Sequence, residues 1–240
     1  METPCTYKME GTLVLLNKLF IVVLLLANSY AENILEIKSQ EIESKFLQAN
    51  LVKLSDVDSS IKVNLVNSNA DNNFFKMNFY GNLNECYLQK KIIYKLKNAQ
   101  IFLKQKKPNL SLLLMDCARP RSVSWKMYNK LKDTPFERYV ANPITGSMHN
   151  YGSAVDITLI DSNGSHLDMG MNPFYKNRLE LLYAVTKNKL FPSLTKEQNK
   201  NRLLLKSVME KAGFKSIKLE WWHFNGFSKK VIRKNYKIIE

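Results

Sequence analysis

Hydrophobic residues follow two different spacings in the middle and C-terminal parts of the chain. Between Tyr87 and Gln105 they recur every three or four positions, which predicts an amphipathic helix that ends before Pro108. Unbroken apolar runs at 110–116 ("LSLLLMD") and 155–161 ("VDITLID") predict short buried strands. Alternating apolar residues predict a third strand over 215–224 ("KSIKLEWWHF").

The remaining segments complete this picture. Helical spacing predicts further helices over 123–131 and 201–214, and Gly213 is expected at the C-terminal cap of the second one. Residues 54–87 are rich in Asn and irregular, which indicates strand fragments and loops. Helices that precede strands, and strands closed by hairpin-like turns, indicate an α+β domain with a mainly antiparallel sheet flanked by helices.

The N-terminus has a separate character. An apolar core runs from Leu13 to Ala27, interrupted by Asn17 and Lys18, and its unbroken part is too short to cross about 30 Å of hydrocarbon as a helix. Small residues at 29–31 ("SYA") resemble a cleavage site. We therefore expect a signal peptide over 1–31, with an N-terminal membrane anchor as the alternative. Residues 32–53 are expected to form an extension, as a polar-faced helix or a loose segment.

Charge and cysteine content narrow the possible partners and the compartment. The formal net charge is +15, but the lysines are scattered and lack interleaved aromatic residues, so we expect no nucleic-acid partner. After signal removal Cys86 and Cys117 remain. An exported protein, periplasmic or secreted, permits a disulfide between them, and two buried free thiols are the alternative.

His149 and Asp156 are the first candidates for chemistry. Asp156 lies inside an apolar run, where an isolated carboxylate is costly and needs a partner or a metal. His149 precedes it in a loop with small residues at Gly152 and Ala154, which allow close backbone approach. One more nitrogen donor would complete a catalytic zinc set of two histidines and a carboxylate.

His223 is the expected third ligand, because His166 lies in a polar turn that indicates a surface position. Glu220, three residues before His223, would supply the general base of a zinc hydrolase. On a regular strand these two side chains would face opposite sides, so a twist or bulge is needed. The alternatives are histidines with structural roles in the core, and Trp221 and Trp222 as core filling.

Two patterns together carry a family resemblance. They are S-x-H-x-x-G-x-A-x-D and E-x-W-H, formed by Ser147, His149, Gly152, Ala154 and Asp156 and by Glu220, Trp222 and His223. This pair resembles the zinc D-Ala-D-Ala peptidase superfamily, which includes VanY-type carboxypeptidases, VanX-type dipeptidases and hedgehog domains. The segments "NFYGNLNECY", "MDCARPRSV" and "LDMGMNPF" resemble the dipeptidases of peptidase family M15 more specifically. The resemblance spans about Leu54 to Phe224.

The resemblance implies a role for each site residue. His149, Asp156 and His223 would bind one Zn²⁺, Glu220 would be the general base, and Arg119 would stabilise the oxyanion. Ser147 and Asp168 would contact a small D-dipeptide, and residues 54–240 would form the zinc peptidase domain. The expected reaction is hydrolysis of D-Ala-D-Ala during peptidoglycan metabolism, with membrane contact only through an uncleaved N-terminus.

The chain also departs from the family pattern, which keeps rivals open. Tyr175 follows Phe174 where the family has an aspartate, in a loop that helps to hold the substrate's ammonium group, and Cys117 and Ala118 replace the usual Gly and Tyr. One rival is a carboxypeptidase or endopeptidase that acts on peptidoglycan stem peptides. Another is a non-catalytic binding module stabilised by zinc.

Overall fold

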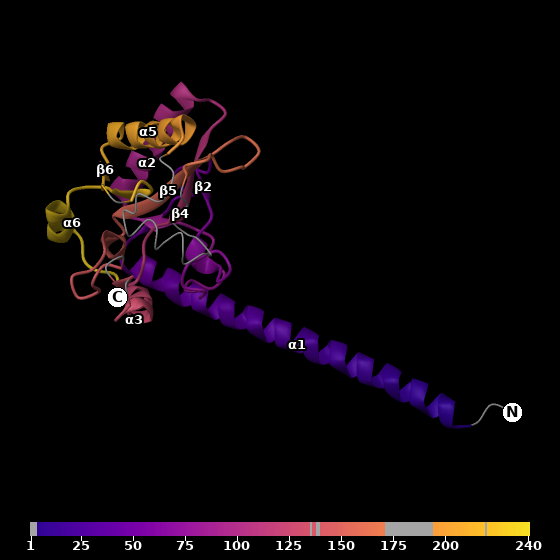
Figure 1. Cartoon of the computed structure of the whole chain (residues 1–240). Helices are drawn as coiled ribbons and strands as arrows, with labels where there is room; N and C mark the ends of the chain where they lie inside the picture. The colour runs from indigo at the N-terminus through magenta and orange to yellow at the C-terminus, as the bar shows by residue number, and fades with distance from the viewer. Residues whose placement is uncertain (1–3, 135, 138–139, 171–193, 219) are drawn as a thin grey trace.

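The computed structural model of the chain describes residues 4–134, 136–137, 140–170, 194–218 and 220–240, with side chains from Asn17 onward (Figure 1). The main sheet has the strand order β2-β4-β5-β7-β6. Its strands are β2 (Lys62–Val63), β4 (Ser111–Asp116), β5 (Ala154–Ile160), β6 (Lys215–Ser216) and β7 (His223–Asn225). Among these described strands only β2 and β4 pair in parallel, so the expected α+β fold with a mainly antiparallel sheet is confirmed.

Helices enclose this sheet. On one face α2 (Lys90–Lys106) and α5 (Lys196–Lys211) pack against each other and against β4 and β5 (Figure 1). Away from these two helices lie α3 (Arg121–Leu131) and the end of α1 (Pro4–Gln48). The short helix α6 (Lys229–Asn235) packs beside the 3-10 helix η3 (Met148–Tyr151). Every residue of β5 is buried, as expected for a central strand covered on both sides.

Helix α1 combines an exposed rod with a buried end (Figure 1). Leu19–Leu26 are exposed, whereas Ile42 and Phe46 belong to the main core. The rest of the domain contacts this half of the helix closely, because a Cβ added to Gly81 would lie 2.1 Å from the carbonyl oxygen of Leu35. The segment 32–53 is therefore a helix through Gln48 followed by β1 (Val52–Lys53), and its second half packs into the main core.

The start of α2 differs from the prediction. The helix begins at Lys90 rather than Tyr87, because Tyr87–Leu88 form β3, which pairs with Val52–Lys53 of β1. Gln89 then has an extended backbone and precedes the first helical turn. The strand fragments and loops predicted for the preceding region are found as the short strand β2 and turns, whereas the 3-10 helix η1 (Val66–Ser68) was not predicted.

The prediction of one continuous strand over 215–224 is wrong for the middle of that segment. β6 and β7 are short strands that pair antiparallel, and the segment between them contains a turn in which the His223 amide donates to the Glu220 carbonyl (3.3 Å). The predicted strand at 110–116 is found as β4, that at 155–161 as β5, and the helix at 123–131 as α3 from Arg121. Helix α5 begins at Lys196, five residues before the prediction, because Thr195 and Gln198 form a capping box.

Candidate metal centre

Strand register brings the polar residues of the site into one row. Asp156 of β5 lies opposite Asp116 of β4 on one side and His223 of β7 on the other. A bulge in β4 between Leu114 and Asp116 shifts the register, which turns Asp116 to the face that carries Asp156. Asp116, Asp156 and His223 therefore lie next to one another on three neighbouring strands.

His149 reaches this row from η3. The Ser147 side chain accepts a hydrogen bond from the His149 amide and caps the helix, and Asn150 completes a capping box with Ser147. Gly152 ends η3 in the left-handed conformation (φ 60°), where an added Cβ would lie 2.8 Å from the Leu51 side chain. Gly152, one of the small residues noted in the sequence, thus permits the turn that follows His149.

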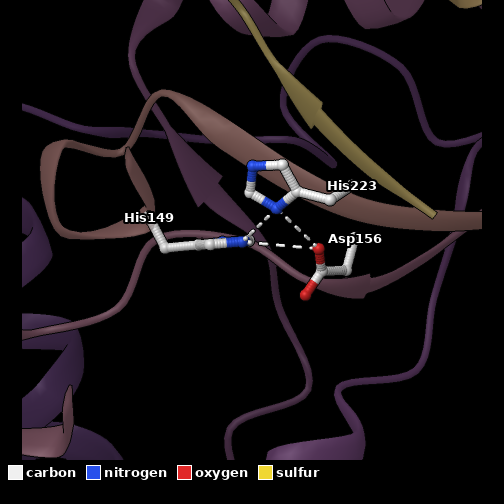
Figure 2. A group of neighbouring side chains, drawn as sticks. All are labelled: His149, Asp156 and His223. Atoms are coloured by element: carbon white, nitrogen blue, oxygen red, sulfur yellow. Dashed lines mark hydrogen bonds and ion pairs between the residues drawn. The ribbon is translucent and has the colours of Figure 1, made fainter. Parts of the chain in front are cut away.

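The three predicted ligands meet at one point (Figure 2). His149 Nε2 lies 3.1 Å from His223 Nδ1 and 3.4 Å from Asp156 Oδ1, and His223 Nδ1 lies 3.0 Å from the same oxygen. All three side chains are buried. They are the one group of three metal-donor residues found in the described part of the chain.

Hydrogen bonds at the far side of each imidazole set its tautomer. His149 Nδ1 donates to the carbonyl oxygen of Cys117 (2.7 Å), and His223 Nε2 donates to Asn225 Oδ1 (3.0 Å). The lone pairs of His149 Nε2 and His223 Nδ1 therefore point at each other and at the carboxylate of Asp156. Three converging acceptors favour a cation between them, and the far-side hydrogen bonds are typical of metal-ligating histidines.

The distances also fit a metal ion. Ligand atoms held about 2.0–2.1 Å from a tetrahedral ion lie about 3.3 Å apart, close to the separations observed between these three donors. Two imidazoles and one carboxylate leave a fourth position open, as catalytic zinc sites do. The residues present therefore fit a divalent metal.

Electrostatics point the same way. Burial alone would lower the pKa of His223, but the hydrogen bond and charge of Asp156 raise it on balance. Burial alone would raise the pKa of Asp156, yet the two imidazoles hold it well below its usual range. The cluster thus stabilises positive charge at its centre.

Glu220 lies at the edge of this cluster. Its Oε2 is 3.9 Å from His223 Nδ1, and its side chain is one-third exposed. Burial raises the pKa of Glu220, partly offset by the nearby positive charges. The turn before β7 puts both side chains on one side, which a regular strand would not do. Trp221 packs on the main core, and both tryptophans are partly buried.

Arg119 is fixed by a network that the sequence did not reveal. Its guanidinium forms a salt bridge with buried Asp116, whose carboxylate also accepts from Tyr80 Oη (2.9 Å) and Asn67 Nδ2 (3.1 Å). Burial alone would lower the pKa of Arg119, but the charge of Asp116 outweighs it and raises the pKa. The only signal of this network in the sequence was Asp116 itself, a carboxylate at the end of an apolar run. Asp156 is likewise a carboxylate in an apolar run.

The two predicted substrate contacts lie in different settings. Ser147 is partly buried beside the predicted ligand His149, with its hydroxyl used as the cap of η3. Asp168 is exposed, and its carboxylate accepts from the Gly170 amide (2.8 Å) and from Gln198 Nε2 (2.9 Å). The altered loop at Phe174 and Tyr175 lies outside the described residues. His166 is exposed, as expected for a surface turn.

A disulfide joins Cys86 and Cys117, so the first of the two alternatives for these cysteines is the one observed. Both cysteines are buried, and their Cα atoms are 5.7 Å apart. The bond links the start of β3 to the turn between β4 and α3, next to the metal-donor cluster.

Comparison with known proteins agrees with this geometry. The chain is 35% identical over 115 residues to the D-alanyl-D-alanine dipeptidase of Escherichia coli (strain K12), which is 48% of this chain and 54% of that protein. It is 34% identical over 92 residues, 35% of this chain and 36% of the relative, to the D-alanyl-D-alanine dipeptidase of Synechocystis sp.. For the protein of that name from Enterococcus faecalis, the identity is 32% over 87 residues, 36% of this chain and 38% of the relative.

The alignments thus span about half the length of these curated relatives or less. A family model described as D-ala-D-ala dipeptidase, Peptidase M15, matches residues 48–239, which include the whole donor cluster. The chain therefore belongs to the M15 family of D-Ala-D-Ala dipeptidases.

Proposed function

We propose that the protein is a zinc-dependent dipeptidase that hydrolyses D-Ala-D-Ala, or a similar short D-dipeptide, in peptidoglycan metabolism. The observation that carries this proposal is the convergence of His149, Asp156 and His223 lone pairs within 4.8 Å of one another, with Glu220 beside them. The names of the relatives support the choice of substrate.

In this proposal the two histidines and Asp156 hold one zinc ion. Zinc bound in this way acts as a Lewis acid and lowers the pKa of a water molecule to about 7. Glu220 then accepts a proton from the attacking water and delivers it to the leaving amine as the C–N bond breaks.

Arg119 would stabilise the negative charge that develops on the carbonyl oxygen. The salt bridge to Asp116 fixes its guanidinium before substrate arrives, so little reorganisation is needed during the reaction. Ser147, adjacent to His149, is proposed to contact the substrate carboxylate, and Asp168 its amino end.

The base is tested by Glu220→Ala, with Glu197→Ala as the control because Glu197 is an exposed glutamate on α5. We expect the Glu220 variant to bind one zinc per chain and to lose at least about 100-fold in kcat, the range of general-base contributions. The Glu197 variant should match the wild type. Full activity of Glu220→Ala would refute the assigned base.

A second candidate is a carboxypeptidase or endopeptidase that acts on stem peptides. It is favoured by the hydrogen bonds that already engage the carboxylate of Asp168, which weaken its use as a clamp for a free ammonium group. Rates on free D-Ala-D-Ala and on an N-acylated tripeptide ending in D-Ala-D-Ala separate the two. Preference for the acylated peptide would exclude the dipeptidase; no hydrolysis of either by the zinc-loaded protein would leave a binding module.

We also propose that the protein works outside the cytoplasm. Residues 17–48 of α1 are long and apolar enough to cross a membrane by length and composition, a property that signal sequences share. The disulfide supports an oxidising compartment. Mass spectrometry of the mature N-terminus separates cleavage after Ala31 from retention as an anchor.

A further inference from the structure

The turn that follows β4 supplies two parts of the site within a few residues. The carbonyl oxygen of Cys117 accepts the 2.7 Å hydrogen bond from His149 Nδ1, and Arg119 follows two residues later. The Arg119 amide also donates to the His149 carbonyl (3.0 Å), and its own carbonyl accepts from Asn150 Nδ2 (2.8 Å). Residues 117–119 therefore set the position of η3 and of the imidazole that it carries.

The same turn is tied by the disulfide to the residue that precedes β3. Cys86 precedes β3, a strand of two residues, and its carbonyl accepts from the Leu54 amide (2.9 Å). Besides the disulfide, the Ala118 amide donates to the Tyr87 carbonyl (3.2 Å). The disulfide therefore adds a covalent link between the turn at 117–119 and the start of β3, beside the hydrogen bond from Ala118 to Tyr87.

We propose that Cys86 and Cys117 are positioning residues for the metal centre: their disulfide fixes the Cys117 carbonyl, which orients His149 for metal binding. This inference rests on the proposed zinc site. The carbonyl keeps the proton on Nδ1 and the lone pair of Nε2 directed at the other ligands. Loss of such an outer hydrogen-bond partner typically costs about 10- to 100-fold in metal affinity or activity.

The disulfide could instead matter only for overall stability, and the experiment must separate these roles. Leu103→Ala provides the matched control, because Leu103 is fully buried in α2, one turn beyond Gln100, which bonds the Leu112 amide at the start of β4. The metal-donor cluster lies at the other end of that strand. The control destabilises the same core without touching the turn at 117–119.

The test measures zinc affinity by competition with a chromogenic chelator. Wild type, Cys86→Ala/Cys117→Ala and Leu103→Ala are compared as full chains in detergent micelles, well below their unfolding midpoints. We expect both variants to unfold at lower temperature, with a 10- to 100-fold weaker zinc Kd in the cysteine pair variant and less than about a twofold change in the control. At saturating zinc, kcat of the pair variant should recover towards wild type.

Each outcome bears on a distinct claim. Equal zinc affinity in wild type and the cysteine pair variant would overturn the positioning role and leave the proposed function standing. A wild-type chain that binds no zinc would overturn the metal centre, and this inference with it. If the double alanine variant does not fold, zinc affinity is measured instead for the single variants Cys86→Ser and Cys117→Ser. Each of them breaks the same disulfide while nearly preserving side-chain volume.

Discussion

The Asp116 side chain shows how one buried residue serves both stability and the site. Its carboxylate has no exposed surface and accepts hydrogen bonds from Asn67, Tyr80 and Arg119. A buried carboxylate is tolerated only when it is paired and hydrogen-bonded. The same bonds hold the Arg119 guanidinium, which is 13% exposed, in one orientation beside the metal-donor cluster.

Asp116→Asn should therefore reduce both stability and turnover. It leaves the Arg119 charge buried without a counter-charge, which costs about 3–5 kcal/mol in the free energy of unfolding. A guanidinium that is no longer held in place should lower kcat by about tenfold or more. Zinc content should stay at the wild-type value, because Asp116 is not among the three donors. Thermal unfolding, metal analysis and kinetics check this; wild-type kcat in the folded variant would contradict it.

Among the helices and strands, the local hydrophobic pattern was enough to predict those whose buried residues recur at a regular spacing. The run at 110–116 and the spacing from Ile92 to Leu103 gave β4 and most of α2, because covered strands and one-sided helices leave those signatures. Long-range pairing decided the rest: Tyr87 joins β3 because β1 lies beside it. The turn that brings Glu220 beside His223 interrupts an apolar run that reads as one strand.

The candidate site was predictable for a related reason. Charged or polar residues such as Asp156, His149 and His223 are uncommon among apolar or small neighbours, so they are recognisable in a single sequence. The Asp116 network does not, because Asn67 and Tyr80 lie 49 and 36 positions away from the carboxylate that they contact. Only the fold brings these residues together.

Helix α1 is held to the body by an ionic contact that responds to pH. Glu43 accepts a hydrogen bond from Tyr87 Oη and pairs with Lys53 (2.9 Å), and these two contacts lower the pKa of Glu43. A lowered pKa in the folded state means stability that is present above the ordinary glutamate pKa and is lost as the pH falls through the folded value.

Glu43→Gln should therefore unfold about 2–4 °C below wild type at pH 7, for a loss of about 1 kcal/mol at a partly exposed site. The gap between the two unfolding midpoints should shrink as the pH falls from about 4.5, the ordinary glutamate value, through the lower folded-state pKa, below which Glu43 is protonated in both folded and unfolded chains. Thermal melts across this range provide the measurement. A gap independent of pH would show that the Glu43 charge does not hold α1.

At the scale of the whole molecule, the chain divides into an apolar rod and a cross-linked body (Figure 1). The rod exposes Leu19–Leu26, whereas the last turns of the same helix are part of the core. Cleavage after Ala31 would thus remove the exposed apolar stretch and leave the packed end in place. Retention would leave the body attached to this apolar stretch, which is long enough to cross a membrane.

Metal binding should also stabilise the body as a whole, because the three donors come from η3, β5 and β7 and meet only in the folded chain. At a free zinc concentration about 1,000 times Kd, binding adds about 4 kcal/mol, or a rise of roughly 10 °C in the unfolding midpoint. Removal of zinc by a chelator should reverse this shift, and added zinc should restore it. An unchanged midpoint would argue against a site shared by these elements.

The most direct test of the central claim is zinc stoichiometry measured together with D-alanine release from free D-Ala-D-Ala, for wild type and His223→Ala. We expect one zinc per wild-type chain and two D-alanines per dipeptide, with both zinc binding and D-alanine release lost in the variant. A wild-type chain that releases D-alanine without zinc, or a variant that retains both properties, would contradict it.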